Sequence, residues 1–208
     1  MFNKIKHPLI ILLFFIIGCF IFKDTFFSVH DVPRELLIPK GILEGKILYK
    51  EIYNFYGALP YYIVALFFKI FKLSTNAYFS INIINSLFFI FGIYFLANQF
   101  INKKYACLTT IFVMCTAIFN ATIFNFIYPY SICYTFALSA YVYSILFLVK
   151  FYKKNDDKYF TISSILLGFC VASKNEFFTK TQQNGDFNYY RINYNGTAEN
   201  KNYGGYVE

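Results

Sequence analysis

The sequence has few charged residues and no tryptophan. Only 14% of its 208 residues are charged, whereas 58% are hydrophobic. A soluble domain carries about a quarter charged residues, and a disordered chain combines low hydrophobicity with high charge. Both classes are therefore excluded, and the composition predicts an integral membrane protein. Because all aromatic residues are Phe (29) or Tyr (20), Tyr is the residue expected to anchor helices in the headgroup layer.

The chain also lacks paired cysteines and closely spaced histidines. All five cysteines lie inside apolar runs, and none belongs to a CxxC pair. We interpret them as small hydrophobic residues, not as a disulfide framework or a metal site. His7 and His30 are not at ligand spacing, so no metal or other cofactor is predicted. The net charge of +8 resides in lysines between apolar runs, which indicates membrane topology and not nucleic-acid binding.

Long uncharged runs predict an all-α, polytopic transmembrane protein of about five spans. Three runs are long enough to cross a bilayer, and two shorter ones are bounded by lysines whose side chains can snorkel. The expected spans lie near residues 8–22, 77–101, 105–128, 131–149 and 159–173. The first run also fits a signal peptide cleaved at Cys19, but the apolar residues continue past that cysteine, which favours an uncleaved helix.

A further apolar run, 55–68, is short for a span and is predicted to be interfacial or re-entrant. With the N-terminus in the cytoplasm, Lys103, Lys104 and the lysines of 150–158 then fall in cytoplasmic loops, as the positive-inside rule requires. Six spans with an external N-terminus is the alternative, but it places the basic N-terminus on the wrong side. The five-span plan leaves one long external loop, 23–76, which groups five of the 11 acidic residues.

The composition changes after Phe178. Residues 179–208 are rich in Asn, Gly and Tyr and show no apolar periodicity. Such a segment cannot cross a membrane or bury a core, so a polar C-terminal tail that is disordered or weakly ordered is predicted. The predicted domains are a transmembrane region, 1–178, and this tail, 179–208.

Four charged residues near the predicted external face are candidates for chemistry. The Asp31 carboxylate can act as a general base toward an acceptor hydroxyl, or it can stabilise a helix N-terminus. Arg34 can bind a phosphate through its bidentate fork, and Glu35 is a second acidic candidate for substrate binding. Lys174 ends the last apolar run, where it can contact a phosphate or snorkel to the interface.

Four short motifs follow one another between residues 31 and 178. They are Asp-x-Pro-Arg at Asp31, Gly-Lys-x-Leu-Tyr at Gly45, Tyr-Gly-x-Leu-Pro-Tyr at Tyr56 and Gly-x-x-x-x-Ser-Lys ending at Lys174. In this order they resemble the N-terminal part of glycosyltransferase family 39 of the GT-C class. That family includes protein O-mannosyltransferases and lipid A aminoarabinose transferases.

The resemblance implies a fold, a site and a reaction. Asp31 is then the catalytic carboxylate, Lys174 lies near the lipid phosphate, and the first external loop holds juxtamembrane helices. The implied reaction transfers a sugar from a polyprenyl-phosphate donor to an extracytoplasmic acceptor with inversion, in a bacterial inner (plasma) membrane. Its partners are this donor and the lipid bilayer. Family members are longer, so we expect the chain to be a truncated form that is inactive alone.

Two other functional classes stay open. A truncated relative of such an enzyme can serve as a non-catalytic membrane scaffold or assembly partner. The second class is a small transporter subunit, but transporters place paired ionisable residues within their spans. The apolar runs between residues 77 and 173 carry Lys only in the links that join them, which argues against ion or proton coupling.

Overall fold

The structure is a computed structural model, and it describes residues 2–22, 31–54, 56–120, 125–174, 190–192 and 198–200. It is mostly helical and divides into two units, Met1–Asn175 and Glu176–Glu208. The first unit holds the helices α1 (Phe2–Phe22), α2 (Asp31–Leu43), α3 (Ala58–Phe71), α4 (Thr75–Ala97), α5 (Lys103–Val113), the π-helix η1 (Met114–Ile118), α6 (Ile132–Lys154) and α7 (Asp157–Ser173). The second unit holds the strands β1 (Tyr190–Ile192) and β2 (Ala198–Asn200).

Polar side chains set where two of the long helices begin. The Ser74 hydroxyl accepts a hydrogen bond from the Ala77 N–H (3.1 Å) at the start of α4. The Asn102 side chain accepts one from the Tyr105 N–H (3.2 Å) at the start of α5. Such caps satisfy N–H groups that have no partner within the helix. The start of α6 differs, because the Ser131 side chain makes no capping hydrogen bond there.

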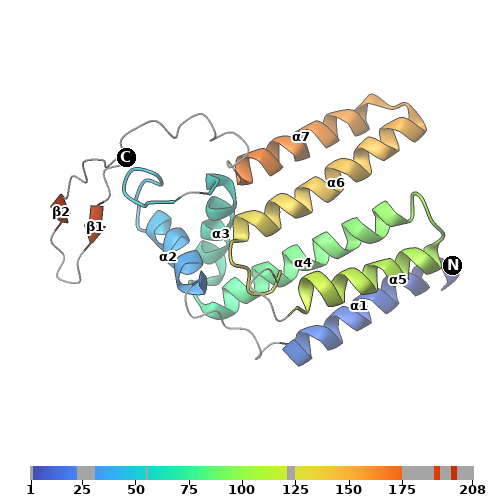
Figure 1. Cartoon of the computed structure of the whole chain (residues 1–208), viewed down its shortest axis with the longest axis horizontal. Helices are drawn as coiled ribbons and strands as arrows, with labels where there is room; N and C mark the ends of the chain where they lie inside the picture. Colours follow the sequence, from blue (N-terminus) through green and yellow to red (C-terminus); the bar gives the residue numbers. More distant parts are fainter. Residues whose placement is uncertain are drawn as a thin grey trace, which may run out of the picture. The chain divides into compact units, whose positions relative to one another are not determined.

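The helices α4 and α6 run parallel at the centre of the first unit (Figure 1). Asn82, early in α4, donates to the carbonyl oxygen of Ile127, just before α6 begins (3.1 Å). At the other end, Lys153 of α6 donates to the carbonyl oxygen of Gln99, just after α4 ends. A Cβ atom at Gly92 of α4 would lie only 2.7 Å from a Tyr143 ring atom of α6. The glycine therefore permits the close approach of these two helices.

The remaining long helices pack around this central pair. The helix α7 lies against α6, where the hydroxyls of Ser144 and Ser163 are 3.0 Å apart and each donates to the carbonyl oxygen of the other residue. On the other side, α5 contacts α4, and α1 contacts α5 (Figure 1). Ile11 and Phe15 of α1 are buried in the core. This packing supports the uncleaved first helix, which stays a prediction.

Two of the described helices are long and apolar enough to cross a membrane. They are α4 and α6, with 23 residues each, and they match the runs predicted at 77–101 and 131–149. Shorter apolar helices occupy Lys6–Ile21, within α1, and Ala58–Phe71, which is α3. The runs 8–22 and 159–173 coincide with α1 and α7. The mostly helical fold is thus confirmed, whereas the number of spans stays a prediction.

The run predicted as a span at 105–128 is helical only in its first part. The helix α5 passes into η1 and ends at Ile118. Further on, the Asn125 side chain accepts the N–H groups of Ile127 (3.0 Å) and Tyr128 (2.6 Å), a local turn that competes with helix. The prediction of one helix through residue 128 is therefore wrong. Ile127, near the end of this run, is nevertheless buried, with 3% of its surface exposed, although it is not part of a helix.

The predicted external loop, 23–76, contains α2 and α3. Gly45 adopts φ +86° just beyond the end of α2, which glycine does at little steric cost. The helix α3 contacts α2, α4, α6 and α7. It lies beside the starts of α4 and α6 and the end of α7 (Figure 1). The apolar run 55–68 thus contributes most of a packed helix of 14 residues. Helices within this loop are confirmed, and their place at the membrane surface stays a prediction.

The second unit contains a small antiparallel hairpin. Tyr190 pairs with Asn200, and Ile192 pairs with Ala198. The composition of the polar tail 179–208 predicts no strands. The two strands β1 and β2 are therefore a feature that the sequence did not indicate. Disorder of the rest of this tail stays a prediction.

Candidate functional site

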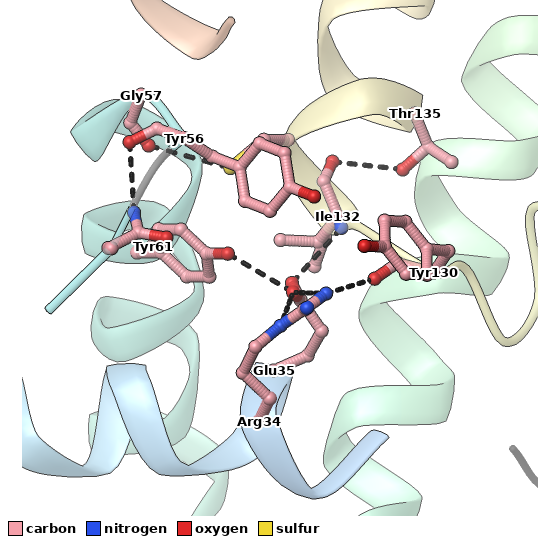
Figure 2. Close-up of polar contacts among 10 residues, drawn as sticks. Arg34, Glu35, Tyr56, Gly57, Tyr61, Tyr130, Ile132 and Thr135 are labelled. Atoms are coloured by element: carbon pink, nitrogen blue, oxygen red, sulfur yellow. Dashed lines mark hydrogen bonds and ion pairs between the residues drawn. The ribbon is translucent and has the colours of Figure 1, made fainter. Parts of the chain in front are cut away.

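The Glu35 carboxylate caps the N-terminus of α6, where the Ser131 side chain makes no capping hydrogen bond. Its side chain comes from α2 and has no exposed surface. One carboxylate oxygen, Oε2, accepts the N–H of Ile132, the first residue of α6 (3.1 Å). The other, Oε1, accepts the Tyr61 hydroxyl of α3 (3.1 Å), so three helices meet at this side chain (Figure 2). A helix N-terminus favours a negatively charged group, because its first N–H groups have no partner within the helix and the positive end of the helix dipole lies there.

Arg34 connects this buried carboxylate to the surface. Its Nη2 atom donates to Glu35 Oε1 (3.1 Å) and to the carbonyl oxygen of Tyr130 (2.6 Å) (Figure 2). The guanidinium carbon also lies 4.9 Å from the ring centre of Tyr130 and 5.6 Å from that of Tyr56. About a third of the side chain (36%) stays exposed. The protein therefore holds this cation in one orientation while part of it faces outward.

Burial and charge shift the pKa values of this group. Burial raises the pKa of Glu35 from 4.5 to about 7, although the Ile132 N–H, Arg34 and Tyr61 all act in the opposite direction. For Arg34, burial lowers the pKa, but Glu35 and Tyr130 more than compensate and raise it above its ordinary value. Burial and Glu35 also raise the pKa of Tyr61 far above its ordinary value. Tyr61 therefore stays protonated as a donor, and Arg34 stays charged.

The raised pKa of Glu35 predicts a pH-dependent stability. The folded chain binds the Glu35 proton more tightly than the unfolded chain, so this contribution is complete below pH 4.5 and is lost as the pH rises to about 7. A shift of this size corresponds to about 3 kcal/mol of unfolding free energy. In detergent, melting followed by circular dichroism should give a lower melting temperature at pH 7 than at pH 4.5.

A Glu35→Gln variant isolates this contribution. Glutamine keeps an acceptor oxygen for Ile132 and Tyr61 but cannot titrate. The difference in melting temperature between the two chains should therefore change across the same pH range, whatever the other acidic residues do. An identical pH dependence in both chains would show that Glu35 does not titrate in this interval.

The segment before α3 contacts the end of α7 beside Lys174. The Gly57 N–H donates to the carbonyl oxygen of Ser173 (3.2 Å), and the Cys133 thiol of α6 donates to the Gly57 carbonyl oxygen (3.4 Å). The Lys174 Nζ atom lies 5.2 Å from the ring centre of Tyr134, in the first turn of α6. Arg34 and Lys174 thus both lie over tyrosine rings near the start of α6, although they are far apart in the sequence.

An open groove of about 600 Å³ lies beside Arg34 in the first loop, between α2 and the turn that follows it. Its lining combines charged residues of both signs, among them Arg34, Lys40, Glu44 and Lys46, with apolar ones such as Leu37. Glu44 forms ion pairs with Lys40 (3.7 Å) and Lys46 (3.5 Å). This lining suits a ligand that has both polar and apolar parts. In the part of the chain that the structure describes, no group of three or more His, Cys, Asp and Glu side chains is placed to hold a metal ion.

The four predicted site residues differ in their exposure and in the groups that they contact. Asp31 is the first residue of α2, but its side chain lies outside the described residues. Arg34 and Lys174 are partly exposed and approach the start of α6. Glu35 is enclosed by Arg34, α3 and α6, so in this structure it contacts protein groups alone. The structure thus brings Arg34, Glu35 and Lys174 to the same helix start.

Sequence reasoning missed two tyrosines and one backbone group of this site. Tyr130 and Tyr134 lie under the two cations, and the Ile132 N–H binds Glu35. In a chain with 20 tyrosines, no local pattern distinguishes these two from the rest. The motif Tyr-Gly-x-Leu-Pro-Tyr was the available signal for Tyr56, Gly57 and Tyr61, but it did not reveal their partners.

Comparison with known proteins identifies the family. Residues 57–179 match the family described as dolichyl-phosphate-mannose-protein mannosyltransferase, which covers more than half of the chain, from the start of α3 past Lys174. Searches of curated proteins and of solved structures give no match. The family implies a polyprenyl-phosphate-linked sugar donor and a membrane setting, which agrees with the two helices long enough to cross a bilayer. The chain therefore belongs to the dolichyl-phosphate-mannose-protein mannosyltransferase family of membrane glycosyltransferases.

Proposed function

We propose that this chain binds a polyprenyl-phosphate-linked sugar at the first-loop end of its helices, as the donor-binding part of a longer transferase that transfers the sugar to an extracytoplasmic acceptor with inversion. The observation that carries the proposal is the convergence of Arg34 and Lys174 on the start of α6. Two cations held at the end of long apolar helices suit a phosphate whose lipid chain lies in the bilayer. The open groove beside Arg34 offers room for the polar part of a substrate.

Each candidate residue has a distinct role in this proposal. Asp31 is the general base that deprotonates the acceptor hydroxyl, and it precedes Arg34 by less than one turn of α2. Arg34 and Lys174 stabilise the negative charge that develops on the leaving phosphate. Glu35 positions Arg34 and the start of α6, because its burial leaves it no open face toward a substrate.

Donor binding tests this proposal directly. The probe is a photoreactive polyprenyl-phosphate-mannose, added to membranes that contain the full chain. We expect labelling of the chain and roughly 10- to 100-fold weaker labelling of the Arg34→Gln and Lys174→Gln variants, since charge-assisted hydrogen bonds contribute about 1.5–3 kcal/mol. A Lys50→Gln variant is the matched control, because Lys50 is an exposed first-loop cation that does not line the groove.

The outcomes separate the functional classes. Labelling with release of polyprenyl phosphate supports the transferase. Labelling without release indicates a chain that binds the donor but is inactive alone, either the truncated form or the non-catalytic scaffold or assembly partner. A chain that is not labelled, or variants labelled as well as the unchanged chain, would overturn the proposed donor site.

We also propose the topology that this reaction needs. The five spans are α1, α4, α5 with η1, α6 and α7, the N-terminus is cytoplasmic, and the loop 23–76 is external in a bacterial inner membrane. In support, the lysines of the two short links, near Lys103 and Lys153, lie at one end of the central helix pair, whereas the long first loop packs at the other end.

Cysteine labelling tests this topology. Lys50 and Lys103 are both exposed, and we expect a Lys50→Cys variant to react with an impermeant thiol reagent from outside intact cells. A Lys103→Cys variant should react only after the membrane is opened. The unsubstituted chain gives the background of the native cysteines. Equal reaction of both variants from the same side would contradict the five-span plan.

A further inference from the structure

Six lysines gather at the end of the helix pair that lies opposite the first loop. They are Lys103 and Lys104 of α5, Lys150, Lys153 and Lys154 of α6, and Lys158 of α7, and we call this set the basic end. Lys153 connects the two turns that carry these lysines, because its Nζ atom donates to the carbonyl oxygen of Gln99 and lies 3.4 Å from the Gln99 side-chain oxygen. The basic end therefore forms one surface where α4 and α6, the two helices long enough to cross a membrane, terminate.

The positive charge of the basic end is mostly uncompensated. Lys158 forms an ion pair with Asp156 (2.7 Å). Among the residues that the structure describes, the other five lysines of the basic end form no ion pair with a carboxylate. The first loop differs, since Glu44 pairs there with both Lys40 and Lys46. A group of like charges on one surface produces a potential that attracts anions.

Aromatic rings accompany these lysines. The Lys153 ammonium lies 5.6 Å from the ring centre of Phe100, and Lys154 and Lys158 lie 5.3 and 5.2 Å from that of Tyr159. Phe100 is 69% exposed and Tyr152 is 83% exposed. Exposed rings beside lysines are typical of the membrane–water boundary, where the ring lies in the headgroup layer and the ammonium reaches the phosphates.

We propose that the basic end binds the phosphate groups of anionic phospholipids. The lysine ammonium groups donate to the phosphate oxygens, while the exposed rings and the apolar ends of the helices contact the upper part of the acyl chains. Phe100 and Tyr152 distinguish this ligand from a soluble anion, which offers an aromatic ring no apolar partner. The site holds the turn between α4 and α5 and the turn between α6 and α7 at one membrane surface. It is separate from the proposed donor site at the other end of α6.

Lipid retention by the purified full chain tests the proposal. The chain is exchanged into nanodiscs that contain equal amounts of phosphatidylglycerol and phosphatidylcholine, and the lipids that remain bound after release into mild detergent are counted by native mass spectrometry. We expect phosphatidylglycerol to be enriched about tenfold. Replacing Lys103, Lys104 and Lys150 by Gln should abolish this enrichment, because each lysine near an anionic surface changes the affinity by roughly fivefold. This variant keeps Lys153 and its contact with Gln99.

Matched variants identify the cause of any loss. Replacing Lys40, Lys46 and Lys50 by Gln removes the same charge from the first loop and should keep the enrichment. Replacing Lys103, Lys104 and Lys150 by Arg should also keep it. Circular dichroism monitors folding, and if the triple Gln variant is unfolded, the Lys103→Gln/Lys104→Gln pair at the exposed start of α5 is measured in its place.

Three results would overturn the proposal. They are a chain without preference for phosphatidylglycerol, an equal loss in the first-loop variant, and displacement of the lipid by millimolar inorganic phosphate, which would indicate a soluble-anion site. The Arg34→Gln and Lys174→Gln variants should retain phosphatidylglycerol normally. Failure of the donor site and failure of the lipid site are therefore distinguishable.

Discussion

An Asp31→Asn variant is expected to transfer sugar roughly 10²–10⁴-fold more slowly than the unchanged chain, which is the usual contribution of a positioned general base. Asparagine removes the negative charge and the basicity of this side chain but keeps an oxygen at the start of α2. Loss of the negative charge from the first turn should lower the stability of α2 by at most about 1 kcal/mol. The measurement is transfer from a polyprenyl-phosphate-linked sugar in membranes where the unchanged chain is active.

A second aspartate provides the control for this variant. Asp156 accepts a hydrogen bond from the Lys158 N–H (3.2 Å) at the start of α7 and lies at the opposite end of the helices. An Asp156→Asn variant should therefore transfer sugar normally. If Asp31→Asn also transfers normally, Asp31 only stabilises the start of α2 and has no part in the chemistry. Equal losses in both variants would indicate a general effect on folding.

The second large effect is expected from a single methyl group at Gly57. A Cβ atom there would lie 2.0 Å from the carbonyl oxygen of Ala172 and 2.6 Å from that of Ser173. These are backbone atoms, which cannot rotate away as the end of a side chain can. The Gly57 backbone itself, with φ −59° and ψ 149°, is accessible to alanine, so any loss comes from this steric contact. We expect Gly57→Ala to destabilise the chain by about 3 kcal/mol, the upper part of the range for overpacking.

Donor binding should fall together with stability in this variant. Separation of Gly57 from Ser173 also moves the neighbouring Lys174, one of the two proposed phosphate contacts. Gly168 of α7 is the matched control, because a Cβ atom there meets no atom within 4 Å. Melting curves and photolabelling should show losses for Gly57→Ala and none for Gly168→Ala. A Gly57→Ala chain as stable as the parent would show that α3 and α7 do not pack this closely.

The helices of the described chain could largely be predicted from the sequence because they follow from local properties. Uncharged runs indicated α1, α4, α6 and α7, and the short run 55–68 indicated a separate helix, which is α3. Asn125 shows the limit of this reasoning. Its side chain binds the N–H groups of Ile127 and Tyr128 and keeps this end of the uncharged run 105–128 out of a helix.

The sequence by itself determined the class of the protein, the family resemblance and the candidates Asp31, Arg34, Glu35 and Lys174, because composition and motif order are properties of the chain alone. Only the tertiary structure decided what surrounds these residues. It buried Glu35 against the Ile132 N–H and placed Arg34 and Lys174 over two tyrosines of the same helix start. The physical reason is that burial, helix capping and cation–π contact depend on groups from distant segments, whose positions are set by the packing of α2, α3 and α7 around α6.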